Sequence, residues 1–254
     1  MKMKPISWYK SLSQPQPRRE SGCFLIDGRR SVDHVLTHRR QSVRELLCVE
    51  ETAQSYQPQS PDIPIRIISE THMNTISPSR APQGVCALVR IPDDVYTSKI
   101  PEASTETNGR ILLLEHVQDP GNAGTLIRTA AAFGFDGVIM SGLCADPFSP
   151  KAVQSTAGSI LSLWIRRGNG YLQMIADLKT RGYKLTAADL NGDDLQLQEN
   201  RDGPRILALG SEGSGLSVDV INMSDRRVRI PISESGAESL NVAVAGGILM
   251  FVWR

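Results

Sequence analysis

The sequence lacks the features that mark secreted, metal-binding and membrane-spanning proteins. Its four cysteines, Cys23, Cys48, Cys86 and Cys144, are widely spaced and form no Cys-x-x-Cys pair, so neither a disulfide framework nor a zinc site is expected. No apolar run reaches the roughly 20 residues that a membrane-spanning helix needs. The N-terminus carries lysines but no apolar stretch of the kind found in a secretory signal. We therefore expect a cytoplasmic protein with reduced thiols, no resident metal and no membrane contact.

The chain also lacks a dominant sign of charge. Its 28 lysines and arginines balance 27 aspartates and glutamates, and 40% of its 254 residues are hydrophobic, which is typical of a soluble protein with one large domain or two ordinary ones. The distribution is less even, because residues 1–44 hold ten cations against only Glu20, Asp27 and Asp33. This local positive excess favours an anionic partner.

Internal repeats and the usual nucleotide-binding fingerprints are missing too. There is no Walker motif, and no Gly-x-Gly-x-x-Gly follows an early strand with an acidic residue about 20 positions later. An ordinary dinucleotide-binding oxidoreductase is therefore disfavoured.

Composition divides the chain into four parts. Residues 1–20 are proline-spaced and basic, which predicts a flexible tail. Residues 21–92 alternate short apolar runs with polar segments and predict a small α/β domain. Residues 93–109 have loop composition and predict a linker, and residues 110–254 form the second domain.

The second domain alternates strands with helices. A buried-type strand is predicted at 111–115 and further strands at 137–140, 161–165, 183–188, 205–209 and 227–230, which indicates a mostly parallel sheet with ligands near the carboxyl ends of its strands. The last segment, Val242–Trp253, has almost no polar residue and is rich in alanine and glycine. Because chain ends are normally polar and frayed, this one must be buried against its own core or against a second subunit.

The loop that opens the helix after the first of these strands carries two polar residues that packing alone would not select. Asn122 stands at the helix start and Arg128 about two turns later. Asn122 could serve only as a helix cap, and Arg128 could be a solvated surface cation. The apolar or small neighbours of Arg128 instead indicate a largely buried helix, in which an arginine needs anionic or carbonyl partners.

Two later loops raise the same question. Gly210–Gly215 could be a tight turn or a phosphate-cradling loop. The carboxylate of Glu212 would be a poor lining for a phosphate pocket but a good ion-pair partner for Arg128. Before the terminal helix, Ser239 could be a cap and Asn241 could satisfy backbone groups. Each loop is ambiguous by itself.

Together the three loops match a known pattern. The blocks DPGNAGTLIRTAAAFGF (119–135), LALGSEGSGLS (207–217) and IPISESGAESLNVAVAGGIL (230–249) resemble the three signature motifs of the SpoU/TrmH branch of the SPOUT RNA ribose 2′-O-methyltransferases. The first domain is similar to the small ribosomal-protein-like RNA-binding module that often precedes them, through the residues at 26–32 and 81–87.

The resemblance implies an α/β fold: a trefoil-knotted SPOUT methyltransferase domain with a mostly parallel sheet, preceded by a small α/β RNA-binding domain. It further implies that S-adenosylmethionine is the cofactor, held by Leu209, Gly210, Ile230 and Leu240, and that the helix of the first motif and the C-terminal helix form a homodimer. A helix surface of small residues suits close packing against a two-fold partner.

The family's catalytic and substrate-site residues correspond to Asn122, Arg128, Glu212, Ser239 and Asn241. The implied reaction is an in-line attack of a ribose 2′-hydroxyl on the sulfonium methyl, which requires alignment and removal of a proton. Arginine keeps its proton, so we expect Arg128 to bind the target phosphate, orient the hydroxyl or stabilise developing negative charge. The proton acceptor is then a carboxylate such as Glu212, a phosphate oxygen or water.

The expected partner is RNA. Arg29, Arg30, Arg39 and Arg40 are candidates for phosphate contacts in the first domain, although a solvated helix face would have the same composition. Because a separate RNA-binding module is predicted, ribosomal RNA is the first choice of substrate. Transfer RNA, and a non-catalytic RNA-binding protein with the same fold, are the alternatives.

Overall fold

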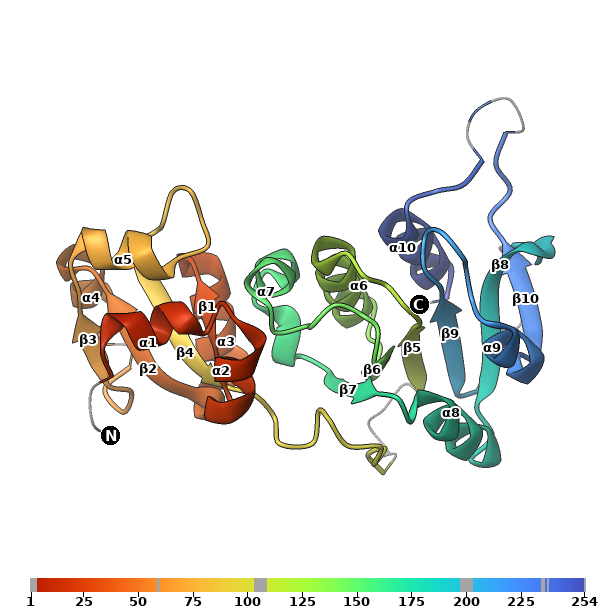
Figure 1. The fold of residues 1–254 in the computed structure, drawn as a ribbon, viewed down its shortest axis with the longest axis horizontal. Helices are drawn as coiled ribbons and strands as arrows, with labels where there is room; N and C mark the ends of the chain where they lie inside the picture. Colours follow the sequence, from red (N-terminus) through yellow and green to blue (C-terminus); the bar gives the residue numbers. More distant parts are fainter. Residues whose placement is uncertain are drawn as a thin grey trace. The chain divides into compact units, whose positions relative to one another are not determined.

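The computed structural model describes residues 4–58, 60–102, 109–196, 203–233, 236 and 238–253. The chain forms two compact units (Figure 1). Unit 1 comprises residues 1–93 and 146–162, and unit 2 comprises residues 94–145 and 163–254.

Unit 1 is built on a four-stranded sheet with the order β1-β4-β2-β3. The central strand β4 is antiparallel to β1 and β2, and β3 is parallel to β2. The predicted α/β fold of this part of the chain is therefore confirmed. Its elements are β1 (Cys23–Asp27), α3 (Arg29–His38), β2 (Val43–Cys48), α4 (Glu50–Tyr56), β3 (Ile65–Ile67), α5 (Glu70–Ile76) and β4 (Val85–Arg90).

The prediction of a flexible tail at residues 1–20 is wrong for the described residues 4–20. They form α1 (Ile6–Ser11) and α2 (Pro15–Ser21), and Tyr9 and Leu12 are buried in the core beneath them. Proline does not break the helix here. Pro15 occupies the first turn of α2, where its missing N–H costs nothing and its fixed φ suits the helix. Residues 1–3 of the predicted tail lie outside the described residues.

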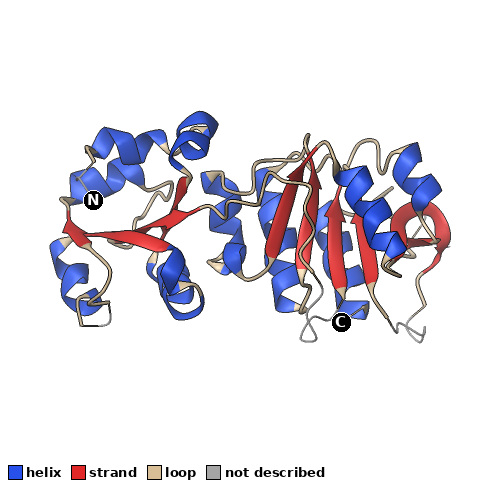
Figure 2. Cartoon of the chain, turned by 90° about the horizontal axis from the view of Figure 1, so that it is seen from below, coloured by secondary structure: helices blue, strands red, loops and turns tan. Residues whose placement is uncertain are grey.

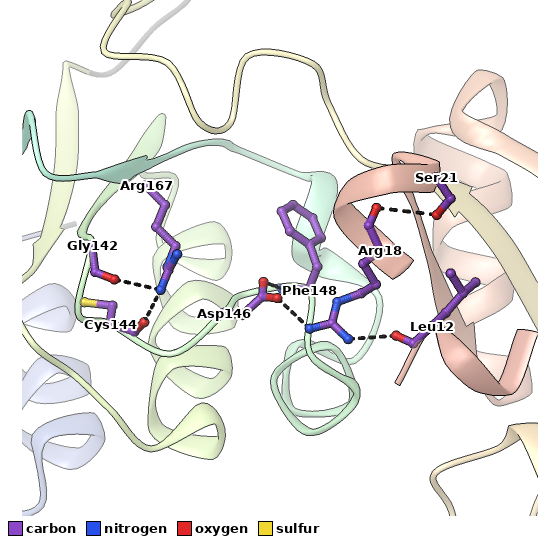
Figure 3. A network of polar contacts seen from close by, with 8 residues as sticks. All are labelled: Leu12, Arg18, Ser21, Gly142, Cys144, Asp146, Phe148 and Arg167. Carbon is purple, nitrogen blue, oxygen red and sulfur yellow. Dashed lines mark hydrogen bonds and ion pairs between the residues drawn. The ribbon is translucent and has the colours of Figure 1, made fainter. Parts of the chain in front are cut away.

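Unit 1 also contains a segment from far along the chain. Residues 146–162, with α7 (Pro150–Thr156) and the 3₁₀ turn η2 (Ser159–Leu161), pack against β1 and α3. The guanidinium of Arg18, whose residue is 2% exposed, bonds to the Asp146 carboxylate at 2.5 Å and to the Leu12 carbonyl at 2.7 Å (Figure 3). The rings of Phe24 and Phe148 meet with their centroids 4.9 Å apart.

Because of this packing, the first domain cannot be removed cleanly by truncating the protein at residue 92. A truncation there would remove the partners of residues 146–162 and leave Asp146 without its buried arginine, which is costly. Point substitutions are therefore the sound way to separate the roles of the two units. The predicted linker does not stand alone either: Val95 and Ile100 are buried in unit 2, while residues 103–108 lie outside the described part.

Unit 2 holds a six-stranded sheet with the order β10-β8-β9-β5-β6-β7, in which every neighbouring pair is parallel. The predicted parallel α/β sheet is thus confirmed, and Figure 2 shows its strands side by side among the helices. The elements are β5 (Arg110–Leu114), α6 (Pro120–Ala132), β6 (Gly137–Ser141), β7 (Trp164–Gly168), α8 (Tyr171–Thr180), β8 (Lys184–Asp194), β9 (Arg205–Leu209), α9 (Val218–Met223), β10 (Arg226–Arg229) and α10 (Val242–Val252).

Helices cover both faces of this sheet. One face packs on α8 and α9 through a cluster that includes Leu113, Ile175 and Val220. α10 packs against α6 and β9, and α6 against β6. The central strands are buried along almost their whole length, which explains why they read as continuous apolar runs. No helix among the described residues is long and apolar enough to cross a membrane.

The C-terminal helix α10 is buried on one side only. Gly246 lies so close to α6 and β9 that an added Cβ would sit 2.3 Å from Leu126 Cδ2 and 2.7 Å from Leu209 Cδ1. On the other side, Val244, Ile248 and Phe251 are 52%, 37% and 51% exposed. The apolar terminus therefore covers its own core and still presents an apolar face.

Two neighbouring glycines of α10 allow a matched test of this packing. Gly246→Ala should lower the free energy of unfolding by ~1–3 kcal/mol, because its methyl group overpacks the contact. Gly247→Ala meets no atom within 4 Å and should raise it by ~0.5–1 kcal/mol, since alanine is the better helix former. Urea unfolding of both variants checks this; equal effects would contradict the close approach of α10.

Candidate active site

Three loops of unit 2 meet where β5 and β9 end and α10 begins. The first follows β5, where Asp119 caps α6 by accepting a hydrogen bond from the Asn122 backbone N–H at 2.8 Å. The second is residues 210–215 after β9. The third leads into α10, where the side chain of Asn241 accepts hydrogen bonds from the N–H groups of Ala243 and Val244. Both helices thus begin at a capping residue, as is usual for short polar side chains.

Side chains from the three loops form a hydrogen-bonded polar cluster, the Asn122 cluster, made of Asn122, Glu212 and Asn241. The Asn122 amide donates to Glu212 Oε1, and the Asn241 amide donates to Asn122 Oδ1 at 3.2 Å. All of these residues are at least partly exposed. The predicted pairing of Glu212 with Arg128 is not seen, because Glu212 is held by Asn122.

Arg128 is exposed, whereas the sequence predicted that it would be buried. It lies on α6 and forms no hydrogen bond or ion pair with another described residue. At about 100° per residue, Arg128 shares a face with the half-buried Gly121 and the exposed Thr125, while Leu126 and Ile127 point into the core. Side chains of a helix lean toward its N-terminus, so Arg128 points along α6 toward the end where Asn122 lies, about 9 Å earlier along the axis and about 120° around it.

The predicted cofactor residues line one pocket of about 510 Å³. Leu209, Gly210, Ile230 and Leu240 are all in its wall. The pocket also takes in Glu212 and Ser239, so two of the predicted catalytic residues border it directly. Asn122, Arg128 and Asn241 do not line it. This volume falls within the range of about 300–1,000 Å³ that is typical of small-ligand pockets.

The glycine-rich loop forms one wall of this pocket and is closed on itself. The backbone groups of Ser211 and Gly215 exchange two hydrogen bonds of 3.0 and 3.2 Å. Gly210 lies directly against this closure: an added Cβ would be 2.2 Å from the Gly215 carbonyl carbon and 2.4 Å from the Leu216 nitrogen. The close approach of two backbone segments is therefore the physical reason for glycine at position 210.

A buried carboxylate beneath the loop was missed in the sequence. Glu115, at the end of β5, is 0% exposed and accepts hydrogen bonds from Tyr171 Oη at 2.5 Å and from the N–H and hydroxyl of Ser217, each at 2.7 Å. Ser217 also caps α9. Burial, followed by the bond to Glu115, raises the pKa of Tyr171 above its usual range. Glu115 thus anchors Ser217, two residues after the glycine-rich loop. The signal in the sequence was an acidic residue directly after an apolar strand.

The electrostatics of the cluster favour a negatively charged ligand. Asn122 lies in the first turn of α6 and Asn241 caps α10, so two helix N-termini meet at their hydrogen bond. The dipole of each helix places partial positive charge at these ends, although side-chain caps already bind the N–H groups of Asn122, Ala243 and Val244. Together with the exposed Arg128 this suits a phosphate group, whereas Glu212 provides a carboxylate beside it.

The four arginines predicted to contact RNA have different surroundings in unit 1. Arg40 is paired with Asp62, which lowers the pKa of that carboxyl below its usual value, and Arg39 donates to the Leu161 carbonyl at 2.8 Å. Arg29 and Arg30 are exposed and line a hollow that also contains Glu51 and Glu70. Arg39 and Arg40 are not among the residues that line this hollow.

Comparison with protein families gives two matches. The model of the SpoU rRNA Methylase family matches residues 109–251, and the model of the MRM3-like substrate binding domain matches residues 4–87. The first match includes all three loops of the site.

Two known proteins resemble almost the whole chain. RlmP of Bacillus subtilis, a 23S rRNA (guanosine(2553)-2′-O)-methyltransferase, is 30% identical over 100% of this chain and 97% of its own. A Synechocystis protein described as an uncharacterized tRNA/rRNA methyltransferase is 30% identical over 98% of this chain and 90% of its own.

Solved structures agree with these matches. An RNA methyltransferase of the TrmH family from Porphyromonas gingivalis superimposes with a TM-score of 0.82 at 31% identity, over 99% of this chain and 98% of the other. The SpoU methyltransferase AviRb from Streptomyces viridochromogenes, solved with AdoMet, gives a TM-score of 0.83 at 26% identity, over 98% and 96% of the two chains.

Proposed function

We propose, since this chain belongs to the SpoU rRNA methylase family, that it transfers a methyl group from S-adenosylmethionine to a ribose 2′-hydroxyl of ribosomal RNA. The observation that carries the proposal is the pocket of unit 2, which Ser239 lines and which Glu212 joins to the polar cluster at two helix N-termini. The similarity to RlmP, named for 2′-O-methylation of 23S rRNA, favours ribosomal over transfer RNA. Such an enzyme would act in the cytoplasm.

The pocket suits S-adenosylmethionine, which AviRb binds in its solved complex. Its wall combines apolar side chains, including Leu209, Ile230 and Leu240, with the backbone of the closed glycine loop. These residues would hold the purine between apolar surfaces and leave backbone groups to select it. When bound, the cofactor supplies a methyl group activated by a positive sulfur.

The residues of the chain align the ribose and manage its proton. Arg128 and the helix N-termini bind the phosphate beside the target ribose, which orients the 2′-hydroxyl. Among the described residues, two carboxylates line the pocket, and Asp189 is paired with Arg227, so Glu212 is the candidate proton acceptor; the Asn122 amide fixes one of its oxygens and leaves the other available. Ser239, exposed in the pocket wall, adds a hydroxyl for polar contact with the substrate.

Unit 1 supplies a second contact with RNA. Arg29 and Arg30 are exposed and would contact phosphates, with Arg29 Nε also donating to the Gln83 carbonyl at 3.4 Å; Arg39 and Arg40 are engaged with Leu161 and Asp62. These cations would position the RNA without reading its sequence.

The methyltransferase unit forms a homodimer in this proposal, and the C-terminal segment passes through the trefoil knot of the family. Support comes from α10, where Val244, Ile248 and Phe251 recur at helical spacing and remain exposed. Ile248→Glu should convert the dimer to a monomer in light scattering, since a charge would be buried in the interface. Leu143→Glu, at another exposed apolar residue of unit 2, should leave the mass unchanged. A monomeric wild-type protein would refute the dimer.

Methylation mapping tests the function itself. Ribosomal RNA from cells with and without the gene should differ by one 2′-O-methylated nucleotide in mass spectrometry, and the purified protein should restore it with S-adenosylmethionine. If a modification disappears from transfer RNA instead, transfer RNA is the substrate. An unchanged set of modifications, with no methyl transfer in vitro, would leave the non-catalytic RNA-binding alternative.

A further inference from the structure

Unit 1 has a groove that the predicted RNA contacts do not include. This N-terminal groove, of about 890 Å³, lies beside α1, α2 and the ends of β1, β2 and β4. The residues of its wall that matter here are Lys4, Trp8, Arg19, Arg44 and Arg90.

The groove is electropositive. Its four cations face two carboxylates, Glu20 and Asp93. Asp93 pairs with Arg90, and Glu20 accepts a hydrogen bond from Gln16 at 2.7 Å. Arg44 is exposed and forms no hydrogen bond or ion pair with any described residue. By contrast, the hollow around Arg29 and Arg30 has as many carboxylates as cations, so the groove attracts anions more strongly.

Strand geometry directs the arginines into the groove. Arg90 ends the central strand β4 opposite Cys23 of β1. Arg44 lies on β2, on the other side of β4, at a register shift between Val43 and Glu45. Such bulges turn a side chain out of the regular alternation of the sheet and are common near functional sites. Cys23, Arg44 and Arg90 all line the groove, so the two guanidinium groups share one surface; burial raises the pKa of the Cys23 thiol, and the two arginines oppose that effect.

An aromatic ring stands beside these cations. Trp8 is half-buried, with the Lys4 ammonium 5.5 Å from its ring centroid and the Tyr9 ring at 5.1 Å in an edge-on arrangement. Protein grooves that hold single-stranded nucleic acid combine cations along the phosphates with an aromatic side chain on which a base stacks.

We infer that the N-terminal groove binds a single-stranded segment of the RNA substrate, with phosphates at Arg44 and Arg90 and a base against Trp8. This inference rests on the proposed function for the identity of the partner. Charge complementarity selects a polyanion, and the polar wall with one aromatic ring selects a nucleic acid strand over a membrane surface. The groove lies wholly in unit 1, and its inferred role is to anchor the RNA.

The test is binding of a fluorescein-labelled oligouridylate 12-mer to the full-length protein, followed by anisotropy at several salt concentrations. Arg44→Glu should weaken binding about ten-fold and reduce the slope of log K against log salt by about 0.7 for each phosphate that the variant no longer neutralises. Lys10→Glu is the matched control, because it makes the same charge change on α1, about 200° around the helix from Trp8 and outside the groove. Tryptophan fluorescence gives a second readout. Unlabelled oligouridylate should quench the fluorescence of the wild-type protein, and Trp8→Phe should show less quenching because a base can no longer stack on this tryptophan.

Two outcomes would overturn the inference: equal affinities of Arg44→Glu and wild type, or equally weakened binding in Arg44→Glu and Lys10→Glu. Methyl transfer to ribosomal RNA distinguishes its failure from that of the proposed function. If wild type methylates and Arg44→Glu has an unchanged KM, only the groove is refuted. If wild type binds oligouridylate in the groove but methylates no RNA, only the enzymatic function is refuted.

Discussion

Arg128→Ala should lower methyl transfer to ribosomal RNA by about 10²- to 10³-fold, the usual cost of losing one donor that stabilises transition-state charge. Affinity for S-adenosylmethionine should stay nearly unchanged, because Arg128 is outside the pocket wall. The residue is exposed and unpaired among the described residues, so its removal should alter stability by no more than about 0.5 kcal/mol. A large loss of turnover would then reflect the loss of a contact between Arg128 and the substrate.

The measurement is single-turnover transfer of labelled methyl groups, with calorimetric titration of S-adenosylmethionine and a thermal melt on each variant. Arg128→Lys keeps the positive charge but loses the planar fork that binds phosphate with two bonds, so it should retain intermediate activity. Lys179→Ala controls for the loss of a cation elsewhere in unit 2, where that lysine pairs with Asp225. Full activity of Arg128→Ala would remove Arg128 from the site, and abolished cofactor binding would make its role structural.

Local patterns predicted most of the fold because their causes are local. The strand at 111–115 and the helix that follows were readable from an apolar run and then a proline-glycine turn, but the cap of that helix is Asp119 and not Asn122, the residue that the sequence had suggested. The parallel sheet followed from the alternation of strands and helices. The assignment of Leu209 and Ile230 to the cofactor came only with the family resemblance. Both residues line the same pocket in the structure, which is the arrangement that a cofactor site requires.

Long-range packing explains what the sequence did not reveal. Arg18 and Asp146 are 128 residues apart, and nothing local indicates that residues 146–162 complete unit 1. Glu115 and Ser217 are 102 residues apart, so the buried anchor of the glycine loop was equally hidden. The burial of Arg128 was misjudged for a different reason: its immediate neighbours are apolar, but helical exposure follows the residues three and four positions away.

Gly210→Ala should have the largest effect on cofactor binding, weakening S-adenosylmethionine affinity by about 100-fold, because shifts near 1 Å in a binding site can cost that much. The new methyl group would meet the Gly215 carbonyl carbon at 2.2 Å and its oxygen at 2.3 Å. These are backbone atoms, so no side-chain rotation can relieve the clash. The loop must open instead, and the wall of the pocket moves with it.

Gly213 offers a control within the same loop. An added Cβ there meets no atom within 4 Å, and its φ is not in the left-handed region, so Gly213→Ala should bind S-adenosylmethionine like wild type. Calorimetric titration measures both affinities, and thermal melts show whether Gly210→Ala remains folded. Overpacking alone costs ~1–3 kcal/mol, which leaves the folded state populated in a protein of ordinary stability. If a folded Gly210→Ala binds the cofactor as well as Gly213→Ala does, the closed loop is not the cofactor wall, and the pocket must serve another ligand.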